Sequence, residues 1–199
     1  MEKVYVAKWY HMIFYPDWFR RLHQRPTKFL AELVKPGMTV ADIGCGLGFY
    51  VRQMAEMAGQ NGRVLAVDFQ SEMLNWTKKK ARRAGVLDRV EFVRCSQDDL
   101  KISEPVDFVL SMWMVHEVPD RERFFKQIQS LLKPEGKYLL AEPKFHVTKQ
   151  LYETICDEAE KAGLTKISEP KVGASFAALF VVDRRKPGTH KQGKALVSL

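Results

Sequence analysis

Long hydrophobic runs are missing from this sequence of 199 residues. The most apolar stretch, residues 106–118, is interrupted by Asp107, His116 and Glu117 and is far shorter than the ~20 apolar residues that a spanning helix needs. The amino terminus has no charged region followed by a plain apolar run. We therefore expect neither a membrane span nor a signal peptide.

Cysteine is also scarce. Three cysteines, Cys45, Cys95 and Cys156, lie far apart, and no Cys-x-x-Cys pair is present. An odd number of isolated cysteines argues against a disulfide framework and fits a reducing compartment, so we expect a cytoplasmic protein. Structural zinc sites use closely spaced cysteine pairs, so none is expected.

Acidic residues are absent from the end of the chain, although the formal net charge of the whole is +8. Residues 184–199 contain five basic residues and no acid, which is typical of a basic, flexible tail. A second basic run contains Lys78, Lys79, Lys80, Arg82 and Arg83. We interpret this run as a solvated helix face, and the alternative is a surface for an anionic partner such as RNA.

Apolar runs at strand length alternate with helical patterns from residue 38 onward. The expected strands are 38–43, 63–67, 90–93, 106–110, 137–141, 164–167 and 177–182. Continuous apolar strands between helices predict an α/β fold of the Rossmann-like class. This fold is a three-layer sandwich in which a seven-stranded, mostly parallel sheet is covered by helices on both faces.

The helices between these strands carry start signals. Ser71, Asp120 and Thr148 each precede a helical pattern and can accept a hydrogen bond from a free backbone N–H of the first turn. Residues 133–136, Lys-Pro-Glu-Gly, are expected to break the chain between a helix and the fifth strand.

Three regions follow from these patterns. Residues 1–35 are rich in aromatic side chains and predict an N-terminal helical extension with a last helix at about 27–34. The extension either covers a pocket as a lid or caps one face of the sheet. Residues 36–183 form the expected catalytic domain, and residues 184–199 the tail.

The strongest motif is Val-Ala-Asp-Ile-Gly-Cys-Gly-Leu-Gly-Phe at residues 40–49. It reads as a strand that ends in an acid, a Gly-x-Gly-x-Gly turn and the start of a helix. Glycine lets the backbone turn sharply and lets a ligand approach it closely. The start of the following helix offers free N–H groups.

A second motif part follows twenty residues after Gly48. The expected strand 63–67 is followed by Asp68, and an acid at this place can accept hydrogen bonds from a ribose diol. The ring of Phe69 can lie against an adenine. The carboxylate of Asp42 would repel a pyrophosphate but attract a cationic ligand end, which favours S-adenosylmethionine over a dinucleotide.

With these residues the chain resembles the class I S-adenosylmethionine-dependent methyltransferases, of the type 11 or ubiquinone-methyltransferase-like group. The resemblance is clear over about residues 27–142. It implies that the glycine loop, Asp42, Gly44, Cys45, Gly46 and Gly48, holds the methionine end of the cofactor, that Asp68 binds the ribose and that Phe69 packs on the adenine.

The same resemblance implies further cofactor contacts. Ser96 and Gln97 occupy the position that contacts the adenine amine, where the family usually has an acid. The backbone at Ser111 and Met112 corresponds to the family's strand-four motif beside the methyl group.

Methyl transfer depends mainly on alignment, and a base matters only if the acceptor must lose a proton. His116 follows the fourth expected strand, and Glu142 and His146 follow the fifth. Because ligands bind at the carboxyl ends of parallel strands, we expect these three catalytic candidates to face the acceptor. The alternatives are ordinary loop polarity and, least favoured, a metal site.

The sequence therefore predicts an S-adenosylmethionine-dependent methyltransferase that acts on a small-molecule acceptor. One alternative is an RNA or protein methyltransferase that uses the basic helix and tail. Another is a cofactor-binding module without activity of its own. The oligomeric state and the acceptor atom stay open at this point.

Overall fold

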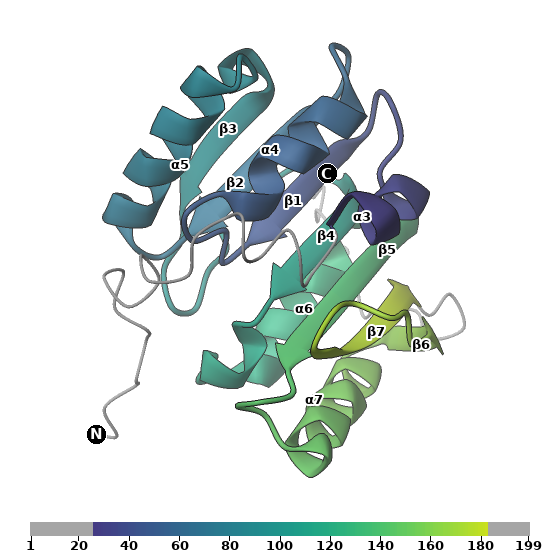
Figure 1. Ribbon diagram of the computed structural model, residues 1–199. Helices are drawn as coiled ribbons and strands as arrows, with labels where there is room; N and C mark the ends of the chain where they lie inside the picture. The colour runs from purple at the N-terminus through teal and green to yellow at the C-terminus, as the bar shows by residue number, and fades with distance from the viewer. Residues whose placement is uncertain (1–25, 183–199) are drawn as a thin grey trace, which may run out of the picture.

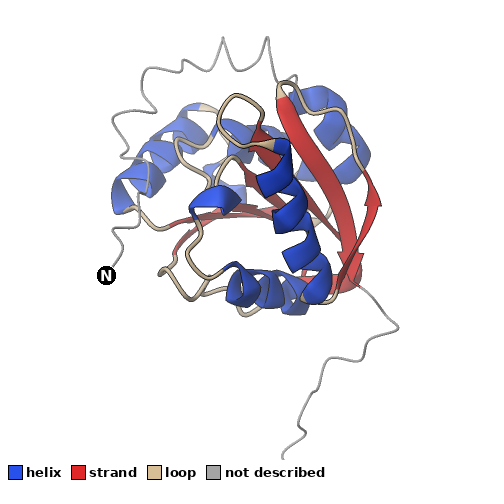
Figure 2. Ribbon diagram, turned by 90° about the horizontal axis from the view of Figure 1, so that it is seen from below, coloured by secondary structure: helices blue, strands red, loops and turns tan. Residues whose placement is uncertain are grey.

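The computed structural model describes residues 26–182, which form a seven-stranded sheet between two layers of helices (Figures 1 and 2). The strand order is β3-β2-β1-β4-β5-β7-β6. The strands are β1 Thr39–Ile43, β2 Arg63–Asp68, β3 Val90–Arg94, β4 Val106–Met112, β5 Leu132–Pro143, β6 Leu164–Ser168 and β7 Ser175–Val182. Strands β1 to β5 pair in parallel and β7 is antiparallel to both β5 and β6, so the predicted fold class is confirmed.

The helices divide between the two faces of the sheet. They are α3 Pro26–Leu33, α4 Phe49–Ala58, α5 Ser71–Arg83, α6 Arg121–Leu131 and α7 Lys149–Lys161, with short 3-10 turns η1 Leu87–Arg89 and η2 Val115–Glu117. The first three pack on one face and α6 and α7 on the other, each over its own apolar core (Figure 1). Both faces of the central strands are therefore buried, which explains their continuous apolar sequences.

Two of the three predicted helix caps are confirmed. The carboxylate of Asp120 accepts a hydrogen bond from the N–H of Arg123, and the hydroxyl of Thr148 accepts one from the N–H of Leu151. The prediction for Ser71 is wrong: it is the first residue of α5, and its hydroxyl bonds to the Glu72 carboxylate instead.

The fifth strand begins earlier than predicted. Residues 133–136 do not separate α6 from the strand, because β5 already starts at Leu132. Leu132 pairs with Val106, and the next pair joins Lys137 to Phe108, so the additional residues form an irregularity within the strand. A bulge of this kind keeps the pairing on both sides of inserted residues.

The predicted last helix of the N-terminal extension is present as α3, where Phe29 and Leu30 are buried. The other expectations for residues 1–25, including a lid, lie outside the described residues, and so does the expected tail. Within residues 26–182, no helix has the length and apolar character to cross a bilayer.

Candidate functional site

A cavity of about 360 Å³ opens at the carboxyl ends of the central strands. The last residues of four strands line it: Ile43, Asp68, Met112 and Pro143. Strand β1 is flanked by β2 on one side and β4 on the other, so the strand order reverses here. Ligands of open α/β sheets bind at this kind of crevice.

The glycine loop forms one wall of the cavity, through Gly44 and Gly46. Gly44 has a φ of 71°, and a Cβ there would lie 2.8 Å from Cγ of Met114. Strand β2 holds the loop in place, because the N–H groups of Gly44 and Cys45 both donate to the carbonyl of Val67. The glycines thus leave room for a ligand to approach the backbone.

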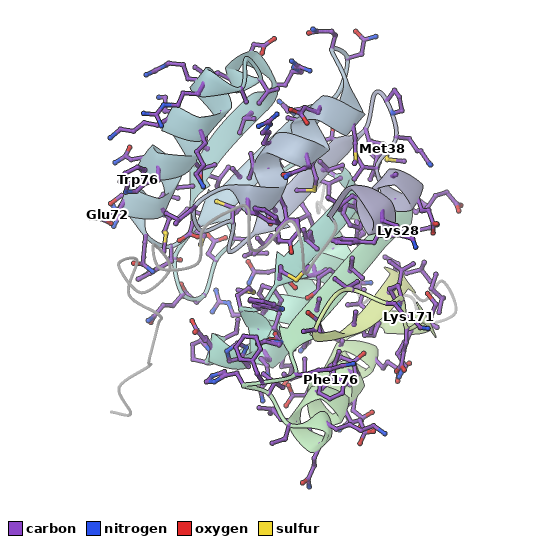
Figure 3. All side chains as sticks on the ribbon, viewed as in Figure 1. Lys28, Met38, Glu72, Trp76, Lys171 and Phe176 are labelled. Carbon is purple, nitrogen blue, oxygen red and sulfur yellow. The ribbon has the colours of Figure 1, made fainter. Side chains whose placement is uncertain are left out.

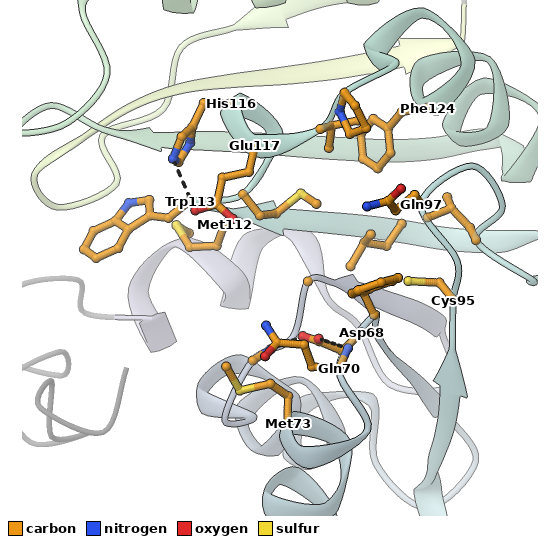
Figure 4. Close-up of a pocket in the computed structure, with 18 of the residues that line it drawn as sticks. Asp68, Gln70, Met73, Cys95, Gln97, Met112, Trp113, His116, Glu117 and Phe124 are labelled. Atoms are coloured by element: carbon orange, nitrogen blue, oxygen red, sulfur yellow. Dashed lines mark hydrogen bonds and ion pairs between the residues drawn. The ribbon is translucent and has the colours of Figure 1, made fainter. Parts of the chain in front are cut away.

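Asp68 connects this loop to α5. One of its carboxylate oxygens accepts a 2.8 Å hydrogen bond from the N–H of Gly46, and the other accepts one of 2.9 Å from the N–H of Gln70. Burial raises the pKa of the Asp68 carboxyl, while the backbone donors act to lower it. Asp68 still lines the cavity, and its remaining lone pairs can accept from a diol (Figure 4).

Phe69, Ser96 and Gln97 line the cavity beside Asp68. The ring of Phe69 is 42% exposed, an unusual state for a large apolar side chain and one that suits stacking on a planar ligand. The hydroxyl of Ser96 donates to Asp98, and its N–H donates to the carbonyl of Asp99. The acid Asp68, the exposed ring of Phe69 and the open glycine loop together fit an adenosine that carries a cationic chain.

At the opposite end of the cavity, Glu142 holds His116. Oε1 of Glu142 accepts from the N–H groups of Val115 and His116, and Oε2 lies 2.6 Å from Nδ1 of His116. A carboxylate only accepts, so Nδ1 carries the proton and Nε2 is left with a lone pair. Nε2 lies 3.9 Å from the carboxylate of Glu117, the contact drawn in Figure 4.

Three groups set the basicity of this imidazole. Burial acts to lower the pKa of His116, but the hydrogen bond to Glu142 and the charges of Glu142 and Glu117 outweigh it and raise the pKa above 6.5. The ring of His146 lies edge-on, with its centroid 4.9 Å from that of His116. In residues 26–182 no three metal-ligating side chains gather as a metal site would require.

Five of the predicted site residues lie behind the cavity wall rather than in it: Asp42, Cys45, Gly48, Ser111 and Glu142. Ser111 bonds to the hydroxyl of Tyr138 at 2.6 Å, and Glu142 is fully buried. Burial also raises the pKa of the Cys45 thiol well above its usual range, which disfavours the thiolate form. Nine other predicted residues line the cavity: Gly44, Gly46, Asp68, Phe69, Ser96, Gln97, Met112, His116 and His146.

Sequence reasoning missed the aromatic wall beside the histidines. Trp113 has a φ of 62°, its indole N–H donates to the hydroxyl of Ser175, and its ring meets that of Phe145 edge-on at 5.3 Å. Phe145 is 67% exposed. No sequence pattern predicts the left-handed backbone conformation of Trp113. Phe145, an aromatic residue three positions after Glu142, is the one signal in the sequence that points to this wall.

The basic run lies within α5, mostly at exposed positions. Figure 3 labels Glu72 and Trp76 on the same helix. Lys79 Nζ lies 5.1 Å from the centroid of the Trp76 ring, and Lys78 Nζ lies 5.9 Å from that of Phe92. These contacts fit the interpretation of a solvated helix face that covers its own aromatic side chains.

Comparisons with known proteins identify the family of the chain. A family model described as "Methyltransferase domain" matches residues 34–193. Ubiquinone/menaquinone biosynthesis C-methyltransferase UbiE is 28% identical over 110 residues in Klebsiella pneumoniae, covering 55% of this chain and 44% of that protein. In Vibrio vulnificus it is 26% identical over 123 residues, covering 60% and 47%. The chain thus spans less than half the length of these curated relatives.

Among solved structures, a SAM dependent methyltransferase from Aquifex aeolicus matches with a TM-score of 0.78 and 26% identity. The match covers 89% of this chain and 100% of that one, so the two chains share the fold over nearly their full length.

Proposed function

The chain belongs to the methyltransferase-domain family and is an S-adenosylmethionine-dependent class I methyltransferase, and from this we propose that it methylates a small molecule whose proton is removed by His116. The observation that carries the proposal is the 2.6 Å contact between Nδ1 of His116 and Oε2 of Glu142. It leaves Nε2 as an acceptor at the cavity.

The residues of the cavity divide into a cofactor end and an acceptor end. At the cofactor end, Asp68 accepts the ribose hydroxyls, Phe69 packs on the adenine with Ser96 and Gln97 nearby, and the backbone of Gly44 and Gly46 borders the methionine chain. When bound, S-adenosylmethionine supplies a methyl group already activated by a sulfonium. Asp42 acts through its charge from behind the wall.

At the acceptor end, the chain's own residues align the acceptor and remove its proton. Trp113, Met114 and Phe145 form an apolar wall against which the body of the acceptor can pack. His116 takes the proton on Nε2, and Glu142 stabilises the resulting imidazolium through Nδ1. Glu142 is therefore a positioning residue, and His146 is the neighbouring group through which the proton can reach solvent.

A cavity of about 360 Å³ supports the small-molecule acceptor, since it lies near the lower end of the size range of ligand pockets, about 300–1,000 Å³. The name of the UbiE relatives points to carbon methylation of a small molecule in those proteins. That acceptor is not carried over to this chain, which covers less than half of them.

The test compares methyl transfer by the wild type and by His116→Gln across small phenols, carbon acids and amines, with methyl-labelled S-adenosylmethionine. We expect kcat to fall by about 10²–10⁴ in the variant, the range for loss of a general base, with the cofactor dissociation constant unchanged. A variant that retains the full rate on the best acceptor would overturn the proposal.

A further inference from the structure

The acceptor end of the cavity combines a carboxylate with aromatic rings, and no described residue of its lining is a lysine or an arginine. The whole described lining likewise has neither of these residues, whereas it contains two acids, Glu117 at the acceptor end and Asp68 at the cofactor end. The carboxylate of Glu142 stands directly behind His116. The chain as a whole is strongly basic, at +8, so this local acidity is opposite in sign to the net charge.

The two described cations closest in sequence to this end are engaged elsewhere. Lys144 follows a residue of the wall, but its Nζ lies 5.2 Å from the centroid of the Phe176 ring. Arg121 bonds to both oxygens of Glu158, at 2.5 and 3.1 Å. Neither is among the cavity residues. An acceptor with a carboxylate or phosphate would thus be buried without a counter-charge, which is costly.

The aromatic wall acts in the same direction. Trp113 and Phe145 meet edge-on at 5.3 Å, and Phe145 is largely exposed. The faces of aromatic rings attract cations, most strongly that of tryptophan. Glu117 lines the same cavity as these two rings, and a carboxylate together with aromatic rings suits the recognition of an ammonium group.

Resting on the proposed function, we propose that the acceptor is a small primary amine that binds as the ammonium ion, with Glu117 as its counter-charge and Trp113 and Phe145 around its apolar body. Glu117 lies 3.9 Å from Nε2 of His116, so an ammonium held by this carboxylate is brought to the base. An ammonium ion, unlike a phenol or a carbon acid, is matched by the carboxylates of Glu117 and Glu142 at this end of the cavity.

The reaction balances with these residues alone and the cofactor's methyl group. One N–H bond of the ammonium breaks, and its proton passes to Nε2 of His116. The nitrogen lone pair then forms the bond to the methyl carbon while the carbon–sulfur bond breaks, with its electron pair left on sulfur. The product is a secondary ammonium ion, which keeps the single positive charge of the acceptor.

The experiment measures binding of three matched probes to the full chain saturated with S-adenosylhomocysteine, by calorimetry at pH 7.5. The probes are phenethylamine, 2-phenylethanol and 3-phenylpropanoate, which carry a cation, a neutral hydroxyl and an anion on similar bodies. We expect the amine to bind about tenfold more tightly than the alcohol, and the carboxylate more weakly still.

Two variants assign the preference to Glu117. Glu117→Gln is expected to reduce the amine-to-alcohol ratio by about tenfold. Glu122→Gln, which changes an exposed acid on α6 that pairs with Lys126, is expected to leave the ratio unchanged. Undetectable binding of the amine, equal or tighter binding of either other probe, or an unchanged ratio in Glu117→Gln overturns the inference. The proposed function fails separately, through full activity of His116→Gln.

Discussion

Oε2 of Glu142 lies 2.6 Å from Nδ1 of His116; Glu142 stands near the end of β5, and His116 lies in η2, the turn that follows the adjacent strand β4. The same carboxylate accepts from the N–H groups that begin η2. One buried side chain therefore fixes both the position and the protonated edge of the imidazole. Several consequences for solution behaviour depend on this pair.

The pH dependence of methyl transfer tests the pair directly. His116 must be neutral to accept a proton, so the rate should rise with pH through the raised pKa of the free enzyme. Glu142→Gln removes the charge that raises this pKa. The profile of kcat/KM should therefore move to lower pH as its maximum falls. A profile that stays in place would mean that Glu142 only supports the loop.

The contribution of the His116–Glu142 pair to the stability of the fold should fall as pH rises, whereas the rate of methyl transfer should increase. The pKa of His116 is higher in the folded chain than its ordinary 6.5, so the pair stabilises the fold fully below that value. The contribution is lost as pH rises through the folded pKa. The difference in Tm between the wild type and His116→Gln should thus be larger at pH 6 than at pH 9. An equal difference at both would contradict the assignment.

Gly48 tests the geometry of the loop. Its φ is 73°, and a Cβ there would lie 2.6 Å from Cγ2 of Thr77. Gly85 has a similar φ of 69°, but open space surrounds its Cβ position. Gly85→Ala should cost only the backbone strain, about 1 kcal/mol. Gly48→Ala adds overpacking and should cost about 3 kcal/mol in denaturant unfolding. An equal loss in the free energy of unfolding for both variants would show that α5 shifts to make room for the added methyl group.

The helix caps provide a matched pair of substitutions. Thr148→Ala removes a hydroxyl that accepts from the N–H of Leu151, and it should destabilise the fold by about 1 kcal/mol. Ser71→Ala removes a hydroxyl that caps nothing, and its effect should stay within about 0.5 kcal/mol. Thermal unfolding of both variants measures the two losses of stability. A loss for Ser71→Ala larger than that for Thr148→Ala would mean that Ser71 does cap α5.

The sequence predicts the fold well because strand periodicity and the glycine motif are local signals. Asp68 and Phe69 are identified by their place after a strand, and the structure brings both to the cavity. The start of β5 was mispredicted, because pairing with β4 holds Leu132 in the sheet despite the following Lys-Pro-Glu-Gly. Long-range pairing of this kind overrides local turn signals.

The acceptor end was less predictable for the same reason. The sequence presents His116, Glu142 and His146 as one group of candidates, and only the fold separates the buried Glu142 from the two histidines that line the cavity. The rings of Trp113 and Phe145 meet although the two residues follow different strands. The indole N–H of Trp113 donates to the hydroxyl of Ser175 in β7, which orients the ring. No spacing within one segment encodes that contact.

The most direct measurement is calorimetric titration of the purified chain with S-adenosylmethionine and separately with NAD, for the wild type, Asp68→Ala and Asp88→Ala. Asp88 is an exposed aspartate beside Arg89 and serves as the control. We predict that S-adenosylmethionine binds with a dissociation constant of about 1 μM, that Asp68→Ala loses this binding and that Asp88→Ala keeps it. Binding of NAD instead, or unchanged affinity in Asp68→Ala, would contradict the account of the cavity.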